Sequence, residues 1–381
     1  MRTVTYSRSV FLPVINLCRN RCAYCSFLAH EGKREEEDYF EGLAAEIRSR
    51  AAEAAGGLSF DSVYFGGGTP SYVDPHRLGR VLGTLEEAFG LCSDAEVTAE
   101  ANPDDLTAGR LLSLRDIGIN RLSVGVQSLV DSELAPLERR HDAAGAVDAL
   151  RRAVDLFGNV SADLMIGIPG QTRESLLSSV EGLLAAGVSH VSVYLLEIEK
   201  APRLVALRGE RPGLFADDDE MADRWLEVDE RLEAAGLPRY EISNWARPGR
   251  ESRHNLKYWT LTPVLGFGVA AHSFDGRRRF ANTGSMAEYG QRARERISPV
   301  SSFEETPEDP LRRKEGLMLG LRLSGGVPSS SFEEIRATLP AASAGRLEDA
   351  FAAGLLETVS GRVRLTRRGV LLSNEVFQAF L

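Results

Sequence analysis

Apolar, strand-like runs alternate with amphipathic stretches through the first half of the chain, and this alternation limits the fold more than any other feature. Six runs predict β-strands, at residues 10–15, 62–65, 96–100, 121–126, 161–166 and 191–196. The stretches between them predict helices, at residues 36–55, 76–89, 107–117, 143–157 and 172–186. Repeated βα units with short right-handed crossovers make a parallel sheet, so we expect an α/β fold.

Polar residues at the ends of the predicted strands favour an open, partial barrel of six βα units over a doubly wound sheet. Residues 66–69 (GGGT), Glu100, Gln127 and Asp163 fall within or at the ends of these strands. Barrel enzymes place their chemistry at the carboxyl ends of the strands. We therefore expect one mouth of the barrel to collect all of these residues.

The pattern changes after about residue 199, which predicts three domains. The partial barrel is expected at residues 1–200 and a helical and β extension, rich in Gly and aromatic residues from 240 to 276, at 201–300. A small C-terminal domain is expected at 301–381.

The C-terminal domain is expected to resemble a winged helix. Its polar start, residues 301–310, predicts a linker, and helical patterns follow. Residues 356–359 and 362–365 then predict a β-pair around a Ser360–Gly361 turn.

Charge and hydropathy exclude some classes of partner. The 381 residues include 45 basic and 55 acidic ones, a formal charge of −10, so a broad basic footprint for duplex nucleic acid is not expected. No apolar run approaches the roughly 20 residues of a membrane span, and the first residues lack an apolar signal core. We expect a soluble cytoplasmic protein.

Three of the four cysteines, Cys18, Cys22 and Cys25, lie in one segment after the first predicted strand, with the spacing C-x3-C-x2-C. A structural zinc site would need a fourth ligand, from His30 or a distant residue, and a redox pair would leave one cysteine idle. The spacing favours a [4Fe–4S] cluster with three ligated irons and one open iron, which can bind a substrate or cofactor directly. Cys92 stands alone and has no assigned role.

This cysteine segment resembles that of the radical S-adenosylmethionine (SAM) superfamily. The resemblance implies a [4Fe–4S] cluster on Cys18, Cys22 and Cys25. It also implies that the open iron binds the amino and carboxylate groups of SAM, and that one electron from the cluster cleaves SAM to a 5′-deoxyadenosyl radical.

The same resemblance implies which residues bind SAM. They are Tyr24, Gly67, Gly68, Thr69, Glu100, Gln127, Arg139 and Asp163. The glycines look like the superfamily's motif for the SAM amino group, Glu100 and Asp163 like acceptors for ribose or amino groups, and Arg139 like a carboxylate contact. From the residues alone, Arg139 could equally neutralise Glu100 or Asp163 in a structural pair.

Longer segments resemble the oxygen-independent coproporphyrinogen III oxidase group of this superfamily. They are residues 64–71 (YFGGGTPS), 100–103 (EANP), 125–128 (GVQS), 163–172 (DLMIGIPGQT) and 240–244 (YEISN). Two features separate the oxidases from the heme chaperones of the group. The oxidases carry a fourth cysteine where this chain has Phe27, and the chaperones carry a His-Asn-x-x-Tyr-Trp motif, matched by residues 254–259 (HNLKYW).

The resemblance to the chaperones implies heme as a third cofactor and cargo. It implies transfer of heme to acceptor heme proteins, including respiratory proteins at the membrane, and suggests a homodimer. A neutral imidazole is a common axial ligand of heme iron, so His254 is the expected ligand, with His272 a second candidate and His141 a weaker one. The alternative is that His254 is a packed, hydrogen-bonded core residue.

Two rival functions stay open. One is a coproporphyrinogen III oxidase, which decarboxylates the propionates of its substrate. The other is a radical SAM enzyme on another substrate, such as a deazaflavin precursor. This second rival is motivated by residues 5–13, which resemble the radical SAM subunit of deazaflavin (FO) synthase. It is also motivated by Leu12, which stands six residues before the first cysteine, where the relatives have a tyrosine.

Overall fold

The parallel strands of the sheet define the centre of the computed structural model, which describes residues 7–13, 18, 22–25, 36–53, 59–305 and 311–381. Strands β1 to β6 pair in parallel with their neighbours in chain order. They are Ser7–Pro13, Ser59–Gly66, Leu91–Ala101, Arg121–Gln127, Val160–Ile166 and His190–Leu195. Each overlaps one of the six predicted strands, so the prediction of repeated βα units is confirmed.

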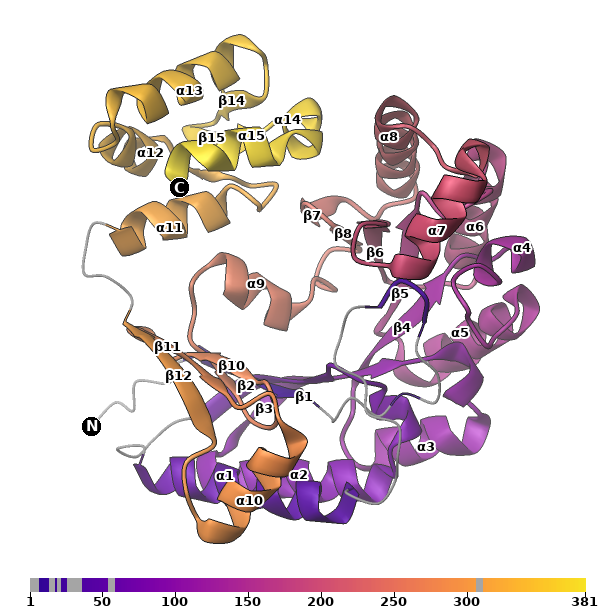
Figure 1. The fold of residues 1–381 in the computed structure, drawn as a ribbon, viewed down its shortest axis with the longest axis vertical. Coiled ribbons are helices and arrows are strands. Elements are labelled where there is room, and N and C mark those ends of the chain that lie inside the picture. Colours follow the sequence, from indigo (N-terminus) through magenta and orange to yellow (C-terminus); the bar gives the residue numbers. More distant parts are fainter. Residues whose placement is uncertain (1–6, 14–17, 19–21, 26–35, 54–58, 306–310) are drawn as a thin grey trace.

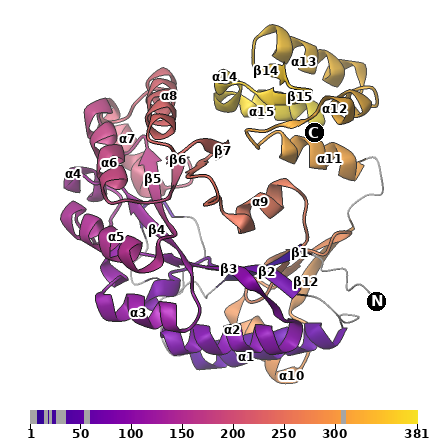
Figure 2. The same cartoon turned by 180° about the vertical axis from the view of Figure 1, so that it is seen from behind.

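Helices follow the strands and cover the outer, convex face of the curved sheet (Figures 1 and 2). They are α1 (Glu36–Glu53), α2 (Pro75–Phe89), α3 (Ala108–Asp116), α4 (Asp131–Leu134), α5 (Ala143–Phe157) and α6 (Arg173–Ala185). Side-chain caps fix where several begin: Asp142 accepts from the Gly145 N–H, and Thr172 forms a capping box with Ser175. The strand order runs from β12 (Val300–Glu305) at one edge to β7 (Arg239–Glu241) at the other, and within the described residues the two edges do not pair, which confirms the partial barrel.

Further strands extend the sheet at both edges. In the described part of the chain, the sheet has 12 strands in the order β12-β11-β10-β9-β1-β2-β3-β4-β5-β6-β8-β7. The added strands are β7 (Arg239–Glu241), β8 (Asn244–Ala246), β9 (Val264–Gly266), β10 (His272–Phe274), β11 (Arg278–Asn282) and β12 (Val300–Glu305). Strand β9 pairs in parallel with β1, and the other added strands pair antiparallel.

The prediction of a linker at residues 301–310 is wrong for its first half. Residues 300–305 form β12, in which Phe303 pairs with Phe280 of β11. The segment resembles a linker in composition because residues 301–304 of this edge strand are all exposed to solvent. Residues 306–310 lie outside the described residues. The domain boundaries near 200 and 300 stay predictions.

The remaining helices connect the edge strands. They are α7 (Pro202–Glu210), α8 (Asp218–Ala234), α9 (Arg253–Trp259) and α10 (Met286–Glu295). Short 3-10 helices lie at several points along the described chain, at Pro70–Tyr72, Pro103–Asp105, Pro212–Leu214 and Gln378–Phe380. The acidic start of α8 is explained by its capping box, in which Asp217 accepts from the Glu220 N–H. None of the helices in the described ranges combines the length and the apolar character that crossing a membrane requires.

The C-terminal part has the winged-helix-like arrangement that the sequence predicts. Its helices are α11 (Leu311–Gly320), α12 (Ser329–Arg336), α13 (Ala341–Ala352), α14 (Arg367–Leu371) and α15 (Ser373–Phe377). Its antiparallel sheet has the order β13-β15-β14, formed by Val327–Pro328, Arg362–Leu365 and Leu356–Val359. Ser360 and Gly361 both have positive φ, as a two-residue hairpin requires. Helix α11 packs against α9, as Figures 1 and 2 show.

Candidate functional site

A pocket of about 500 Å³ lies at the carboxyl ends of β2 to β6, and we call it the barrel-mouth pocket. Its lining residues are Cys18, Cys22, Tyr24, Cys25, Gly68, Thr69, Glu100, Ala101, Asn102, Ser123, Gly125, Gln127, Arg139, Asp163, Met165, Tyr194, Leu195, Leu196, Glu197 and Lys200. All predicted cluster and SAM residues are among them except Gly67, which lies next to Gly68. The expected gathering of polar strand ends at one mouth is therefore observed.

The three cysteines have polar neighbours that suit thiolate ligands. The Thr69 hydroxyl donates to Cys18 Sγ at 3.3 Å, and Arg139 Nη1 donates to Cys22 Sγ at 3.3 Å. The segment is held in place by the Ala23 N–H, which donates to the Leu137 carbonyl at 3.1 Å. Burial raises the pKa of the Cys18 thiol, and the bond from Thr69 opposes that rise.

The donor set fits a cluster with one open iron. The described residues that line the pocket supply three cysteine sulfurs, without a fourth cysteine or a histidine. Within the part of the chain that the structure describes, no three His, Cys, Asp or Glu side chains surround the position of a single metal ion. Thiolates of a [4Fe–4S] cluster bind separate irons, so they need not converge on one point. Phe27 and His30 lie outside the described residues.

Arg139 connects the cysteine segment to the strands. Its Nη2 donates to Asn102 Oδ1 at 2.7 Å and also to the Gly125 carbonyl, while Nη1 reaches Cys22 and, at 3.5 Å, the Tyr24 hydroxyl. Among the described residues, Arg139 forms no ion pair within 4 Å of Glu100 or Asp163. The two carboxyl groups therefore face the pocket without a cation bound to them.

Glu100 is held from two sides. The Tyr64 hydroxyl donates to Oε1 at 2.9 Å, and the Gly67 N–H donates to Oε2 at 3.1 Å. Gly67 has φ of 85°, a conformation that glycine adopts without steric cost. Burial raises the pKa of Glu100 to about 7, with a further contribution from the charge of Asp163, although the bond from Tyr64 opposes the rise.

Asp163 is a second carboxyl group with a raised pKa. Ser123 Oγ donates to its Oδ1 at 3.4 Å. Burial raises the pKa of Asp163 to about 6, and hydrogen bonds from Ser192 and Ser123 oppose the rise. Two buried carboxyl groups with raised pKa values on the wall of one pocket mark a candidate functional site.

Gln127 adopts a strained backbone conformation at the end of β4. Its φ is 69°, in the left-handed region that costs an ordinary residue roughly 1 kcal/mol, and its side chain is buried in the pocket wall. Gly125 leaves the space that this wall needs, because a Cβ there would lie 3.1 Å from Gln127 Nε2 and 3.3 Å from Arg139 Nη2. Strain of this kind is often stored at functional sites.

Some residues of the site were missed from the sequence. Asn102 bonds both Arg139 and, through Nδ2, the Thr69 hydroxyl at 3.3 Å. Tyr64, which binds Glu100, was also missed. Asn102 follows Glu100 by two positions on the same face of the strand, so the two-residue period of a strand could have identified it.

His254 lies outside the barrel-mouth pocket. Helix α9 buries its side chain, which is 2% exposed, against the ring of Tyr64, and the His254 N–H donates to Glu96 Oε1 at 3.3 Å. Its Nε2 shares a hydrogen bond of 3.1 Å with the Tyr258 hydroxyl. Burial lowers the pKa of His254 to about 3, so the imidazole is neutral.

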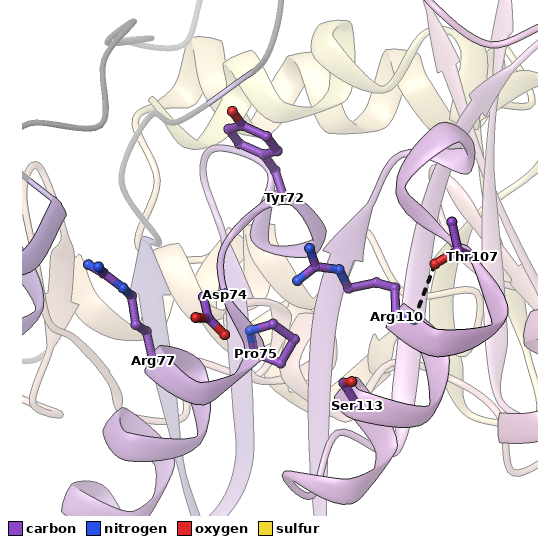
Figure 3. A pocket seen from close by; sticks show the side chains of 7 residues that line it. All are labelled: Tyr72, Asp74, Pro75, Arg77, Thr107, Arg110 and Ser113. Atoms are coloured by element: carbon purple, nitrogen blue, oxygen red, sulfur yellow. Dashed lines mark hydrogen bonds between the residues drawn. The ribbon is translucent and has the colours of Figure 1, made fainter.

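A second hollow, of about 690 Å³, lies at the N-terminal ends of α2 and α3 (Figure 3). Asp74 and Thr107 cap these helices there, and Arg110 donates to the Val73 carbonyl at 2.7 Å. The hollow contains no residue that the sequence analysis identified. The barrel-mouth pocket is therefore the better candidate for the functional site.

Comparison with known proteins gives consistent matches over the whole chain. Residues 12–183 match the model of the radical SAM superfamily, and residues 306–372 match that of the HemN C-terminal domain. A Mycobacterium tuberculosis protein named heme chaperone HemW is 37% identical over 373 residues, covering 96% of this chain and 93% of its own. The chain belongs to the radical SAM superfamily, in its coproporphyrinogen III oxidase-like group.

Other members of this group match over similar lengths. Proteins named heme chaperone HemW from Bacillus subtilis and Escherichia coli are 34% and 30% identical, and each match covers at least 96% of this chain and 97% of the relative. The solved structure of coproporphyrinogen III oxidase (HemN) from E. coli superposes with a TM-score of 0.84 at 22% identity, covering 99% of this chain and 90% of that one. That likeness confirms the fold of a radical SAM protein of this group. Membership of the superfamily also implies a [4Fe–4S] cluster and SAM.

Proposed function

We propose that this chain is a heme chaperone, which binds heme and transfers it to acceptor heme proteins. The observation that carries the proposal is the near full-length similarity to several proteins named heme chaperone HemW. The sequence adds Phe27, where the oxidases have a cysteine, and the HNLKYW segment at residues 254–259. Homodimers, and acceptors among membrane-bound respiratory proteins, are part of the same proposal.

In this proposal, the barrel-mouth pocket holds the cluster and SAM. When bound, the cluster supplies an open iron and an electron for SAM. Cys18, Cys22 and Cys25 would hold the irons, and Thr69 and Arg139 would stabilise two of the thiolates with the hydrogen bonds they already donate.

The strand ends would then orient SAM. The Gly67–Gly68 backbone lies beside Glu100, so an ammonium group there would meet a carboxylate and exposed carbonyls. Asp163 would accept from ribose hydroxyls or the amino group, and Gln127 and Tyr24 would complete the walls. Arg139 would contact the SAM carboxylate, provided that it gives up one of its present acceptors.

Heme binding and transfer are tested together with the rival activity. The cluster-reconstituted protein is titrated anaerobically with heme while the Soret band is recorded, and the heme-loaded form is mixed with a heme-free acceptor protein. Saturable binding followed by heme transfer is expected. Turnover of coproporphyrinogen III in place of transfer would establish the oxidase, and the absence of saturable binding would refute the chaperone.

A further inference from the structure

An apolar hollow of about 400 Å³ lies between α9, β9, β10 and α11, and we call it the α9–α11 hollow. Its apolar lining consists of Tyr258, Trp259, Leu261, Val264, Phe274 and Leu319. Ligand sites commonly have volumes of about 300–1,000 Å³ and mostly apolar walls. The hollow is separate from the barrel-mouth pocket, because the two share no lining residue.

One imidazole, that of His272, lies in this wall. His272 is exposed, and its ring has no hydrogen-bond partner among the residues that the structure describes. It is the first residue of β10, and Phe274, two positions further on, lines the same hollow. A strand places alternate residues on one face, so the two side chains belong to the same wall.

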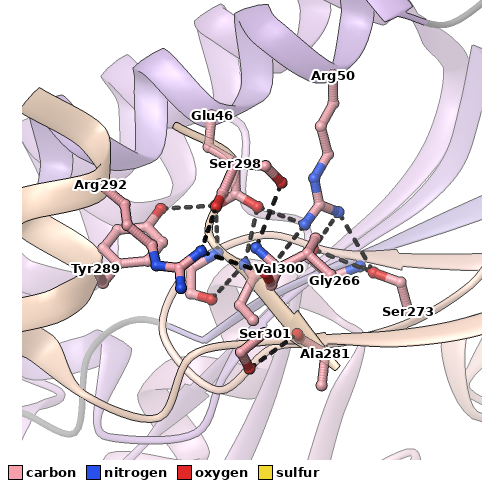
Figure 4. A network of polar contacts seen from close by, with 12 residues as sticks. Glu46, Arg50, Gly266, Ser273, Ala281, Tyr289, Arg292, Ser298, Val300 and Ser301 are labelled. Atoms are coloured by element: carbon pink, nitrogen blue, oxygen red, sulfur yellow. Dashed lines mark hydrogen bonds and ion pairs between the residues drawn. The ribbon is translucent and has the colours of Figure 1, made fainter. Parts of the chain in front are cut away.

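The residue between them anchors the strand. Ser273 accepts a bond of 2.9 Å from the Gly266 N–H and one of 3.4 Å from Arg50 Nη1, inside a buried polar network (Figure 4). Arg50 also pairs with Glu46 at 2.6 Å and donates to Asn282 at 2.7 Å. Ser273 also lines the hollow, and because this network fixes it, the backbone holds the neighbouring His272 at the hollow.

The other described histidines are poorly placed to bind an iron. His190 is fully buried and uses both ring nitrogens, at 2.7 Å from Ser161 Oγ and 2.9 Å from Tyr240 Oη. His141 is buried against the Val126 carbonyl. His76 is exposed on α2, away from both sites.

The HNLKYW segment contributes to this hollow through its last residues. Tyr258 is 40% exposed and lines the hollow, whereas His254 lies behind it and binds its hydroxyl at 3.1 Å. The guanidinium of Arg322 lies 4.1 Å from the Trp259 ring centroid and holds that ring from the other side. His254 is thus a positioning residue for Tyr258.

Two cations line the hollow, and each is paired with a carboxylate. Lys257 pairs with Asp61, and Arg279 of β11 reaches Glu315 of α11 at 2.5 Å. A ligand carboxylate could replace Glu315 as the partner of Arg279. An apolar wall with one imidazole, and an arginine that can exchange its carboxylate partner, fits a porphyrin with a central iron and a propionate.

We propose that the α9–α11 hollow binds heme and that the His272 imidazole is an axial ligand of its iron. This inference rests on the proposed function as a heme chaperone and names its binding site. It selects His272, which the sequence gives as the second candidate, over His254, which the sequence gives as the first.

The test is a titration of the cluster-reconstituted protein with two probes, iron protoporphyrin IX and metal-free protoporphyrin IX. His272→Ala is expected to weaken iron porphyrin binding about tenfold or more and to shift its Soret band, and added imidazole is expected to restore the band. The metal-free probe should bind this variant like the parent. His76→Ala is the matched control and should change neither titration.

A second variant tests the hollow independently of the ligand. Leu319→Trp fills the hollow from α11 and should weaken both probes, whereas Leu112→Trp, at an exposed position of α3, should weaken neither. An iron porphyrin titration of His272→Ala that matches the parent overturns the inference and leaves the chaperone proposal intact. Failure of the parent to bind iron porphyrin refutes the chaperone proposal itself.

Discussion

The ring of Tyr64 lies 4.9 Å from the ring of His254, and the two stack at an angle of 24°. The hydroxyl of the same tyrosine donates to Glu100 in the barrel-mouth pocket. Helix α9 and the candidate SAM site therefore share one side chain on β2. A change in the position of α9 would move a hydrogen-bond donor of Glu100.

Loss of one cluster thiolate gives the most direct prediction. Cys22→Ala should reduce the iron bound after anaerobic reconstitution from about four atoms per chain to about one or fewer, with loss of the visible absorption of the cluster. Cys92→Ala is the control, since Cys92 lies beside Ser59 Oγ at 3.5 Å and does not line the pocket. Full iron content in Cys22→Ala would exclude this residue as a ligand.

The raised pKa of Glu100 predicts a pH dependence of stability. Because its pKa rises from 4.5 to about 7 on folding, the folded state binds this proton more tightly than the unfolded state does. This contribution to the free energy of unfolding is fully present below pH 4.5, the ordinary pKa of the group, and it is lost as the pH rises through about 7. Glu100→Gln removes that loss, so its melting temperature should gain on the parent between about pH 5 and about pH 8 in SAM-free protein. A difference in melting temperature between Glu100→Gln and the parent that stays constant across this range would contradict the raised pKa of Glu100.

Arg139 and its neighbour Arg140 form a matched pair for mutation. Arg139→Gln leaves the Asn102 and Gly125 oxygens without their donor and should lower the free energy of unfolding by about 2–3 kcal/mol, with weaker SAM binding. Arg140 is exposed and pairs with Asp104 at 3.4 Å, so Arg140→Gln should cost about 0.5 kcal/mol or less. Urea unfolding measures the free energy of unfolding of both variants. Equal losses would argue against the stabilising role of the hydrogen bonds that Arg139 donates.

A buried ion pair connects α8 to the C-terminal domain. Asp229 is fully buried and meets Arg367 of α14 at 2.8 Å, while the Trp245 indole donates to its other oxygen at 2.8 Å. Asp229 also pairs with Arg239, whose side chain is 9% exposed, at 3.4 Å. Asp229→Asn should lower the free energy of unfolding by about 3 kcal/mol, because it leaves this largely buried arginine without its carboxylate partner. Glu230→Gln, in an exposed pair with the same arginine, should change it by about 0.5 kcal/mol or less. Similar effects of both variants in a denaturant titration would refute the role of burial.

The central strands and helices could be predicted because their apolar residues follow clear strand-like or helical patterns along the sequence. Six apolar runs and five amphipathic stretches each overlap an observed element, although β1 and β3 begin before the predicted starts at residues 10 and 96. The edge strands β7 to β10 could not be predicted, because each has only three residues, too few to show a period, and because β8 and β9 also pair with distant segments. A polar edge strand such as β12 has the composition of a loop, which explains the wrong linker.

The candidate site was predictable where a residue ends a strand. Glu100, Gln127 and Asp163 interrupt apolar runs, so their position in the barrel mouth follows from the topology. Arg139 lies in a loop, and only the family resemblance indicated it. The burial of His254 was predicted only as the alternative to heme ligation, because a short helix with one histidine has no period that shows which face is covered.

The pairing of β9 with β1 joins residues 264–266 to residues 9–11. One of the two strands that flank β1 in the sheet is therefore not available until residue 266 of 381 has been synthesised. On the ribosome, β2 can pair with β1 early, but one edge of β1 stays open through most of translation. An unpaired edge is a template for wrong partners, including a second nascent chain. The strand that leads into the cysteines therefore stays exposed to such partners until residues 264–266, far downstream in the chain, cover its second edge.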